Sequence, residues 1–192
     1  TRNSKKLLSA HGIQTRMMSY HEHSSEKESQ KIVNLLLEGN DLALISDAGT
    51  PTISDPGYGL IRDCIKHEIR IIPIPGVSAI TAAMSASGLP SDSFTFHGFL
   101  PQKKGRLKKI QDLSHIDNTI ILFESPYRLI KTLTQLLESL GDRSVVVGRE
   151  LTKLYEEIIR GNLSKVLEYF SKSKVKGEIV IMIGKKDDRI HF

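Results

Sequence analysis

Apolar residues follow two different periods along this chain, and the alternation between them is the strongest constraint on its fold. Residues 42–45 form a short, continuous apolar run, as in a buried strand, whereas residues 129–140 carry leucine and isoleucine three or four positions apart, as on one face of a helix. Patterns of the two kinds alternate from start to finish. This order favours an α/β fold with largely parallel strand pairing.

Capping and turn residues set the bounds of the expected elements. Residues 25–28 have the pattern of a capping box that opens a helix, and Gly39, Gly88 and Gly141 are placed to end helices. The expected strands are residues 42–45, 70–74, 94–99, 119–124, 144–148 and 179–183. The expected helices are residues 25–38, around 60–65, 78–87, 129–140 and around 163–170, and residues 156–160 are ambiguous.

The short polar segment at residues 89–93, which contains Pro90, is the best candidate for a domain boundary. We therefore expect two α/β domains, residues 1–89 and residues 90–192. Ligands of such sheets bind beyond the carboxyl ends of the strands. The loops that follow strands are thus the places to look for a site.

The composition is that of a globular protein with an excess of basic residues. The formal net charge of +5 permits a polyanionic partner without identifying one. No apolar run reaches the length that spans a bilayer, and the first residues do not resemble a secretory signal, so a cytoplasmic location is expected. The single cysteine, Cys64, excludes an internal disulfide and is expected to be a small core residue.

Two loops after expected strands have residues suited to ligand contact. In residues 46–51, Gly49 lets the backbone approach a ligand and Asp47 can accept hydrogen bonds. In residues 73–79, Ser78 is placed to cap the next helix. Ordinary turns use the same residue types, so both interpretations stay open. The sequence has no GxGxxG and no GxxxxGK[ST] pattern, which argues against a dinucleotide-binding fold and a P-loop.

The order of several motifs resembles the tetrapyrrole methylase family. The motifs are ALISDAGTP at 43–51, SDPG at 54–57, PGVSA at 75–79, GFLP at 98–101, FESPYR at 123–128, RELTK at 149–153 and KGE at 176–178. They cover essentially the whole chain. Within the family they are most similar to the branch that methylates the ribose 2′-oxygen of a cytidine in small-subunit ribosomal RNA.

The resemblance implies two α/β domains with S-adenosylmethionine in the cleft between them, and a homodimer. The cofactor contacts that it implies are Asp47, Ala48, Gly49, Thr50, Ser78 and Ala79 from the first domain and Phe123, Glu124, Gly177 and Glu178 from the second. It also implies a strand and a Gly-Pro-rich loop before Thr1, so that the first domain is expected to be truncated at its start. No metal and no membrane are implied.

The segment after the strand at residues 144–148 carries the candidate catalytic groups. Methyl transfer to a hydroxyl needs alignment of the reacting atoms and benefits from a group that removes or orients the hydroxyl proton. Glu150 or a neutral Lys153 can do this, and Arg149 can hold a phosphate. The alternative is an Arg–Glu ion pair at a domain interface.

The densest positive cluster suggests contact with RNA phosphates, which positions a nucleic acid without reading its sequence. The candidate contacts are Lys103, Lys104, Arg106, Lys108 and Arg128. The alternative for this cluster is a solvated start of a helix, and for Arg128 an ion pair with Glu124, which ends a strand and is expected to face the cleft.

Two other functions remain in view. One is C-methylation of a tetrapyrrole, against which the basic segment argues, because a tetrapyrrole enzyme has less need of a phosphate-binding arm. The other is a ligand-binding or RNA-binding module without catalysis. His21 and His23 lie two positions apart without a third ligand in view, so a structural or substrate-lining role is expected rather than a metal site.

Overall fold

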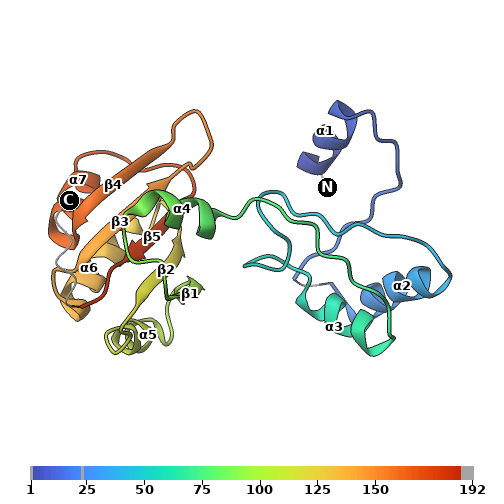
Figure 1. Ribbon diagram of the computed structural model, residues 1–192, viewed down its shortest axis with the longest axis horizontal. Helices are drawn as coiled ribbons and strands as arrows, with labels where there is room; N and C mark the ends of the chain where they lie inside the picture. Colours follow the sequence, from blue (N-terminus) through green and yellow to red (C-terminus); the bar gives the residue numbers. More distant parts are fainter. Residues whose placement is uncertain (1, 23, 187–192) are drawn as a thin grey trace. The chain divides into compact units, whose positions relative to one another are not determined.

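The computed structural model describes residues 2–22 and 24–186, and the chain divides into two compact units, Thr1–Ser78 and Ala79–Phe192 (Figure 1). The first unit contains the helices α1 (Arg2–Ala10), α2 (Glu26–Leu37) and α3 (Tyr58–Lys66). The second contains α4 (Ala79–Ser87), β1 (Phe94–Phe99), α5 (Arg106–Leu113), β2 (Thr119–Glu124), α6 (Leu129–Leu140), β3 (Ser144–Arg149), β4 (Glu157–Asn162), α7 (Leu163–Ser171) and β5 (Ile179–Ile183).

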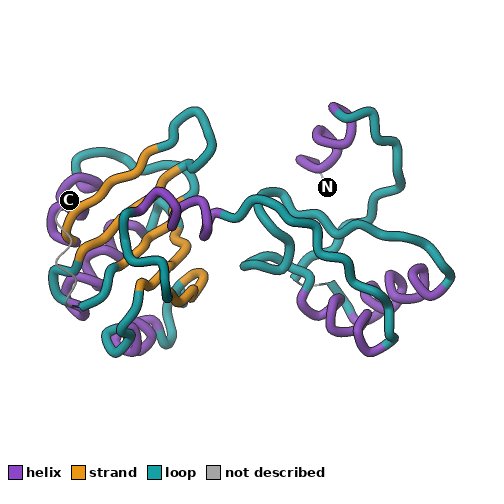
Figure 2. Tube along the Cα trace, in the orientation of Figure 1, coloured by secondary structure: helices purple, strands orange, loops and turns teal. Residues whose placement is uncertain are grey.

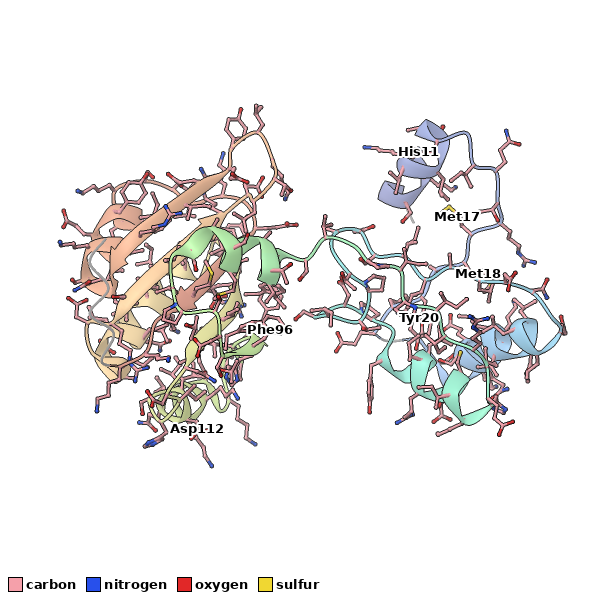
Figure 3. All side chains as sticks on the ribbon, in the orientation of Figure 1. His11, Met17, Met18, Tyr20, Phe96 and Asp112 are labelled. Carbon is pink, nitrogen blue, oxygen red and sulfur yellow. The ribbon has the colours of Figure 1, made fainter. Side chains whose placement is uncertain are left out.

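The first unit is organised around the contact between α2 and α3. The expected capping box is confirmed, because the Ser25 side chain accepts a bond from the Glu28 N–H and the Glu28 carboxylate accepts one from the Ser25 N–H. Ile32 and Val33 of α2 pack with Cys64 of α3, which is 3% exposed. Tyr20, labelled in Figure 3, packs against the same cluster. Cys64 is thus a core residue, as expected, and burial raises the pKa of its thiol.

The prediction of strands at residues 42–45 and 70–74 is wrong. Both segments are loop in Figure 2, and neither takes part in a ladder among the residues that the structure describes. Their apolar side chains are correspondingly exposed, with Leu42 at 45% and Ile72 at 62%. An apolar run marks residues that favour burial, but a strand also needs a hydrogen-bonded neighbour, and neither segment has one within the described residues.

The second unit contains a five-stranded sheet in the order β1-β2-β5-β3-β4. Among the described strands only β1 and β2 pair in parallel, while β2 with β5, β5 with β3, and β3 with β4 are antiparallel. The α/β class is confirmed, but the expectation of largely parallel pairing is wrong. The ambiguous stretch at residues 156–160 contributes to strand β4, which pairs with β3 in an antiparallel hairpin. Strand β5 lies between β2 and β3 and is antiparallel to both.

Helices cover both faces of this sheet (Figure 1). On one face α5, α6 and α7 bury alternate strand residues such as Ile120 and Leu122. On the other face α4 packs against a second set that includes Ile121 and Met182. Helix α4 contacts β5 and belongs to the second compact unit, which begins at Ala79. No helix among the described residues is long and apolar enough to span a membrane.

Candidate active site

The two candidate loops of the first unit lie against each other. The Thr50 hydroxyl donates to the carbonyl of Val77 at 3.0 Å, and the Ser46 hydroxyl closes its own loop onto the carbonyls of Ala48 and Gly49. Gly49 has a φ of 74°, in the left-handed region that favours glycine. Asp47, Ala48 and Gly49 are exposed in this arrangement. The structure therefore joins the two loops, and helix α4 begins at Ala79, directly after Ser78.

In the second unit, three of the motifs meet at the same end of the sheet, where β2 and β3 finish and β5 begins. Ile179, at the start of β5, is in register with Glu124 at the end of β2 and with Arg149 at the end of β3. The segments around Phe123, Arg149 and Gly177, far apart in sequence, are therefore neighbours. The sheet register thus brings together most of the second-domain residues that the sequence singled out.

Glu124 does not face a cleft, which corrects our expectation. Its side chain is 2% exposed, and its carboxylate accepts bonds from the Arg128 guanidinium at 2.7 and 2.8 Å and from the Thr132 hydroxyl at 2.6 Å. The backbone N–H of Ser125 adds a further bond at 2.7 Å. With both oxygens occupied, this carboxylate is part of the internal framework.

Arg106 is also corrected, because its guanidinium is buried and fully engaged. The residue is 3% exposed and donates to Thr132 at 2.6 Å, to Gln135 at 2.8 Å and to the carbonyl of Pro101 at 3.1 Å. It also lies 3.5 Å from the Glu124 carboxylate. It is therefore not available for a phosphate. For Arg128 the structure shows the ion-pair alternative, and Lys103, Lys104 and Lys108 remain exposed.

Glu150, Lys153 and Glu178 form a compact ionic cluster beside Gly177. The Glu150 Oε1 accepts from the Glu178 backbone N–H at 2.8 Å and from Lys153 Nζ at 3.0 Å. Lys153 Nζ also lies 3.0 Å from the Glu178 carboxylate. The Glu150 backbone N–H donates to the Glu178 carbonyl at 2.9 Å. Three of the expected site residues are thus in direct contact.

Electrostatics fix the charge states in this cluster. The hydrogen bonds from the Glu178 N–H and from Lys153 lower the pKa of Glu150 below its ordinary value of 4.5. For Lys153, burial favours the neutral form, but hydrogen bonds to Glu150 and Glu178 outweigh it and raise the pKa above 10.5. Both side chains therefore favour their charged forms more strongly than in water.

The structure pairs Arg149 with Glu157, a residue that sequence reasoning missed. The Arg149 Nε lies 2.8 Å from one Glu157 oxygen, and the Tyr169 hydroxyl donates to the other at 2.5 Å. Both bonds lower the pKa of Glu157 despite its burial, and the bond to Glu157 raises that of Tyr169. The antiparallel hairpin of β3 and β4 places Glu157 opposite Arg149, and the ambiguous pattern of residues 156–160 gave no signal of this pairing.

Metal binding has no visible basis in the described part of the chain. Within residues 2–22 and 24–186, no group of three or more His, Cys, Asp or Glu side chains is placed to hold an ion. Of the two histidines that the sequence places two positions apart, only His21 is described, because His23 lies outside the described residues.

This chain is similar to one known protein family and to several named relatives over most of its length. The sequence model of the family described as Tetrapyrrole (Corrin/Porphyrin) Methylases matches residues 2–167. Three relatives carry the name ribosomal RNA small subunit methyltransferase I. They come from Halalkalibacterium halodurans (44% identity over 99% of this chain), Mesorhizobium japonicum (48% over 96%) and Thermotoga maritima (42% over 97%). The chain covers 66%, 64% and 84% of their respective lengths.

Solved structures show the same fold at lower sequence identity. The methyltransferase CobJ is similar with a TM-score of 0.67 and 18% identity, over 96% of this chain and 83% of its own. A uroporphyrin-III C-methyltransferase from Thermus thermophilus, complexed with S-adenosyl homocysteine, has a TM-score of 0.55 and 18% identity, over 83% of this chain and 74% of its own.

Proposed function

Because this chain belongs to the tetrapyrrole (corrin/porphyrin) methylase family, we propose that it transfers a methyl group from S-adenosylmethionine to the ribose 2′-oxygen of a cytidine in small-subunit ribosomal RNA. The observation that carries this proposal is the 42–48% identity to relatives named ribosomal RNA small subunit methyltransferase I, across nearly the whole chain. The two solved structures, one of them a uroporphyrin-III C-methyltransferase, share only 18% identity with this chain and support the fold alone. RNA is therefore preferred over a tetrapyrrole as the substrate.

The loops of the first unit suit the cofactor. An exposed left-handed Gly49 beside the carbonyl of Val77 leaves main-chain groups open to close approach by a nucleoside. Asp47, Ala48 and Thr50 would contact it from one loop, and Ser78 and Ala79 from the other. S-adenosylmethionine, when bound, supplies an electrophilic methyl group on a sulfonium sulfur. From the second unit we retain Phe123, Gly177 and Glu178 as contacts, and assign the Glu124 side chain to the internal ion network.

Lys153 is the residue that we assign to the reacting hydroxyl, as a cation. Its raised pKa opposes a role as a neutral base, but a positive charge beside a 2′-hydroxyl stabilises the negative charge that develops on the oxygen as the hydroxyl proton passes to water. Glu150 acts as the positioning residue, since its carboxylate holds Lys153 Nζ at 3.0 Å. Arg149, held by Glu157, remains the candidate for a phosphate contact.

The exposed lysines at the start of α5 supply the proposed contacts to RNA phosphates. Lys103, Lys104 and Lys108 are exposed, and Lys103 and Lys104 lie in the loop that Arg106 fastens through the Pro101 carbonyl. A rigid loop with exposed cations positions a polyanion at a small entropic cost. A ribosomal substrate also favours a cytoplasmic location, and a homodimer remains a prediction from the family resemblance.

A transfer experiment tests the proposal against its rival. The chain is incubated with S-adenosylmethionine labelled in the methyl group and with either small ribosomal subunits, their isolated RNA, or uroporphyrinogen. We expect label in the small-subunit RNA and none in the tetrapyrrole. Label in the tetrapyrrole alone would overturn the proposed substrate, and cofactor binding without any transfer would support a non-catalytic module.

A further inference from the structure

Strand β1 contains an irregularity that decides where Phe99 points. Phe96 is paired with Ile121 of β2, but the next pair is Phe99 with Phe123, so β1 has one residue more than its partner over this interval. Gly98, inside the irregularity, has a φ of 59°. A bulge of this kind re-aims the side chains that follow it. In a regular strand Phe99 and Phe96 would lie on opposite faces.

The bulge places three phenyl rings together on the α4 side of the sheet. The ring centroid of Phe123 lies 4.9 Å from that of Phe96 and 5.7 Å from that of Phe99, and both pairs are edge-to-face. Phe96, labelled in Figure 3, and Phe123 pack against the core beneath α4. Phe99 is the outer member of the cluster and stays 53% exposed. The fold thus holds an aromatic ring from one side while leaving much of it accessible.

The loop that follows Phe99 carries positive charge and is held to the fold at Pro101. Lys103 comes four residues later, so its Cα lies within about 14 Å of that of Phe99. The loop between them is not free, because the buried Arg106 guanidinium donates to the Pro101 carbonyl at 3.1 Å and is itself held by Glu124 and Thr132. Lys103 and Lys104 are both exposed.

We propose that Phe99 stacks on an unpaired base of the RNA substrate whose phosphates are bound by Lys103 and Lys104. An aromatic face near exposed cations is the arrangement that recognises single-stranded RNA, in which unstacked bases lie on aromatic rings. The charge of the loop selects a polyanion over an apolar partner. This inference rests on the proposed function and adds to it that the substrate segment is single-stranded at this point.

The test uses the intact chain and a single-stranded oligoribonucleotide that carries the fluorescent base 2-aminopurine. Stacking quenches this base, so one titration gives both the Kd and a stacking signal. Phe99→Ala is expected to raise Kd about 5- to 100-fold and to abolish the quenching. Phe99→Leu, which keeps an apolar side chain, should do the same, whereas Phe99→Tyr should retain both signals. Since Phe99 is uncharged, the salt dependence of binding should not change.

Phe94→Ala is the matched control, because Phe94 lies on the same strand and is 41% exposed. It should bind the oligonucleotide as the unchanged chain does. Normal Kd and quenching for both Phe99→Ala and Phe99→Leu would overturn the inference. So would a loss of S-adenosylmethionine affinity with RNA binding intact, which would assign Phe99 to the cofactor. If the unchanged chain binds neither the oligonucleotide nor small-subunit RNA, the proposed function itself fails, an outcome distinct from these two.

Discussion

The carboxylate arm of Glu150 occupies the space that a side chain at Gly177 would need. A Cβ on Gly177 would lie 2.5 Å from the Cδ of Glu150 and would also collide with its Cγ. Gly177 has a φ of 95°, and Glu150 itself has a φ of 49°, which is unusual for a residue with a side chain. The absence of a side chain at position 177 is therefore what lets Glu150 reach the Glu178 N–H and Lys153.

Gly177→Ala is predicted to displace Glu150 and thereby uncouple Lys153. The backbone strain should cost about 1–2 kcal/mol, and the loss of hydrogen bonds should add about 0.5–1.5 kcal/mol. Gly141→Ala is the control, because Gly141 also has a positive φ of 75° but no atom within 4 Å of the added Cβ. Denaturant unfolding and methyl transfer are measured for both. Only Gly177→Ala should lose transfer activity.

A double-mutant cycle isolates the interaction between the two residues. If the Glu150 side chain is what the added methyl group displaces, then Gly177→Ala should cost less stability in a Glu150→Ala background than in the unchanged chain. Strictly additive effects would show that only the backbone conformation at Gly177 matters.

Substitutions at Arg106 and Lys104, two residues apart in one basic cluster, are predicted to act differently. The first should lower stability, and the second should weaken RNA binding. Arg106→Ala leaves Glu124 buried with one cation fewer, and the free energy of unfolding should fall by about 3–5 kcal/mol. Lys104→Ala, at an exposed position, should change stability by less than about 0.5 kcal/mol and should weaken RNA binding. Urea denaturation of both variants checks this, and a marked loss of stability in Lys104→Ala alone would contradict it.

The exposed lysines should control the salt dependence of RNA binding. For the triple variant Lys103→Ala, Lys104→Ala, Lys108→Ala, the slope of log affinity against log salt should shrink by roughly 0.7–0.9 for each phosphate that is no longer neutralised. The control removes the same charge elsewhere, with Lys27→Ala, Lys31→Ala and Lys165→Ala, all at exposed positions. Equal slopes for the two triple variants would mean that the cluster is only a solvated face.

For methyl transfer, the positive charge of Lys153 is predicted to matter more than any ability of its amine to accept a proton. Lys153→Arg should retain part of the transfer activity, while Lys153→Met should lose about 10²–10³-fold in kcat. If Lys153 acted as a neutral base, arginine would be as inactive as methionine, because its guanidinium does not lose a proton in proteins. Parallel measurements of kcat in both variants decide between the two roles.

The same cluster predicts a pH dependence of stability with a definite sign. Glu150 has a pKa lowered from 4.5, so its contribution is present above about pH 4.5 and is lost as the pH falls through the folded-state pKa. Lys153 has a pKa raised from 10.5, so its contribution is present below about pH 10.5 and is lost as the pH rises through the folded-state value. The effect should be under about 1 kcal/mol, because Lys153 is partly exposed. The loss of unfolding free energy caused by Lys153→Met should therefore be constant between about pH 4.5 and pH 10.5 and should become smaller below and above this range.

Local signals in the sequence predicted most of the second unit. Strong apolar periodicity and Gly141 indicated α6, and continuous apolar runs indicated β2 and β5 with their observed bounds. What the sequence did not reveal depends on partners distant in the chain. The burial of Arg106 against Glu124, and the pairing of Arg149 with Glu157, arise from packing and register, which no local pattern encodes. The two apolar runs of the first unit have the composition of strands, but no described segment pairs with them.

Nucleoside analysis of the methylated RNA shows whether the methyl group is transferred to the ribose of a cytidine. Small ribosomal subunits whose RNA lacks the modification are incubated with the chain and S-adenosylmethionine, and the RNA is digested to nucleosides and examined by mass spectrometry. We expect 2′-O-methylcytidine, which should be absent from the reaction with Lys153→Met. A methyl group found on a base, on the ribose of another nucleoside, or at undiminished yield with Lys153→Met would contradict it.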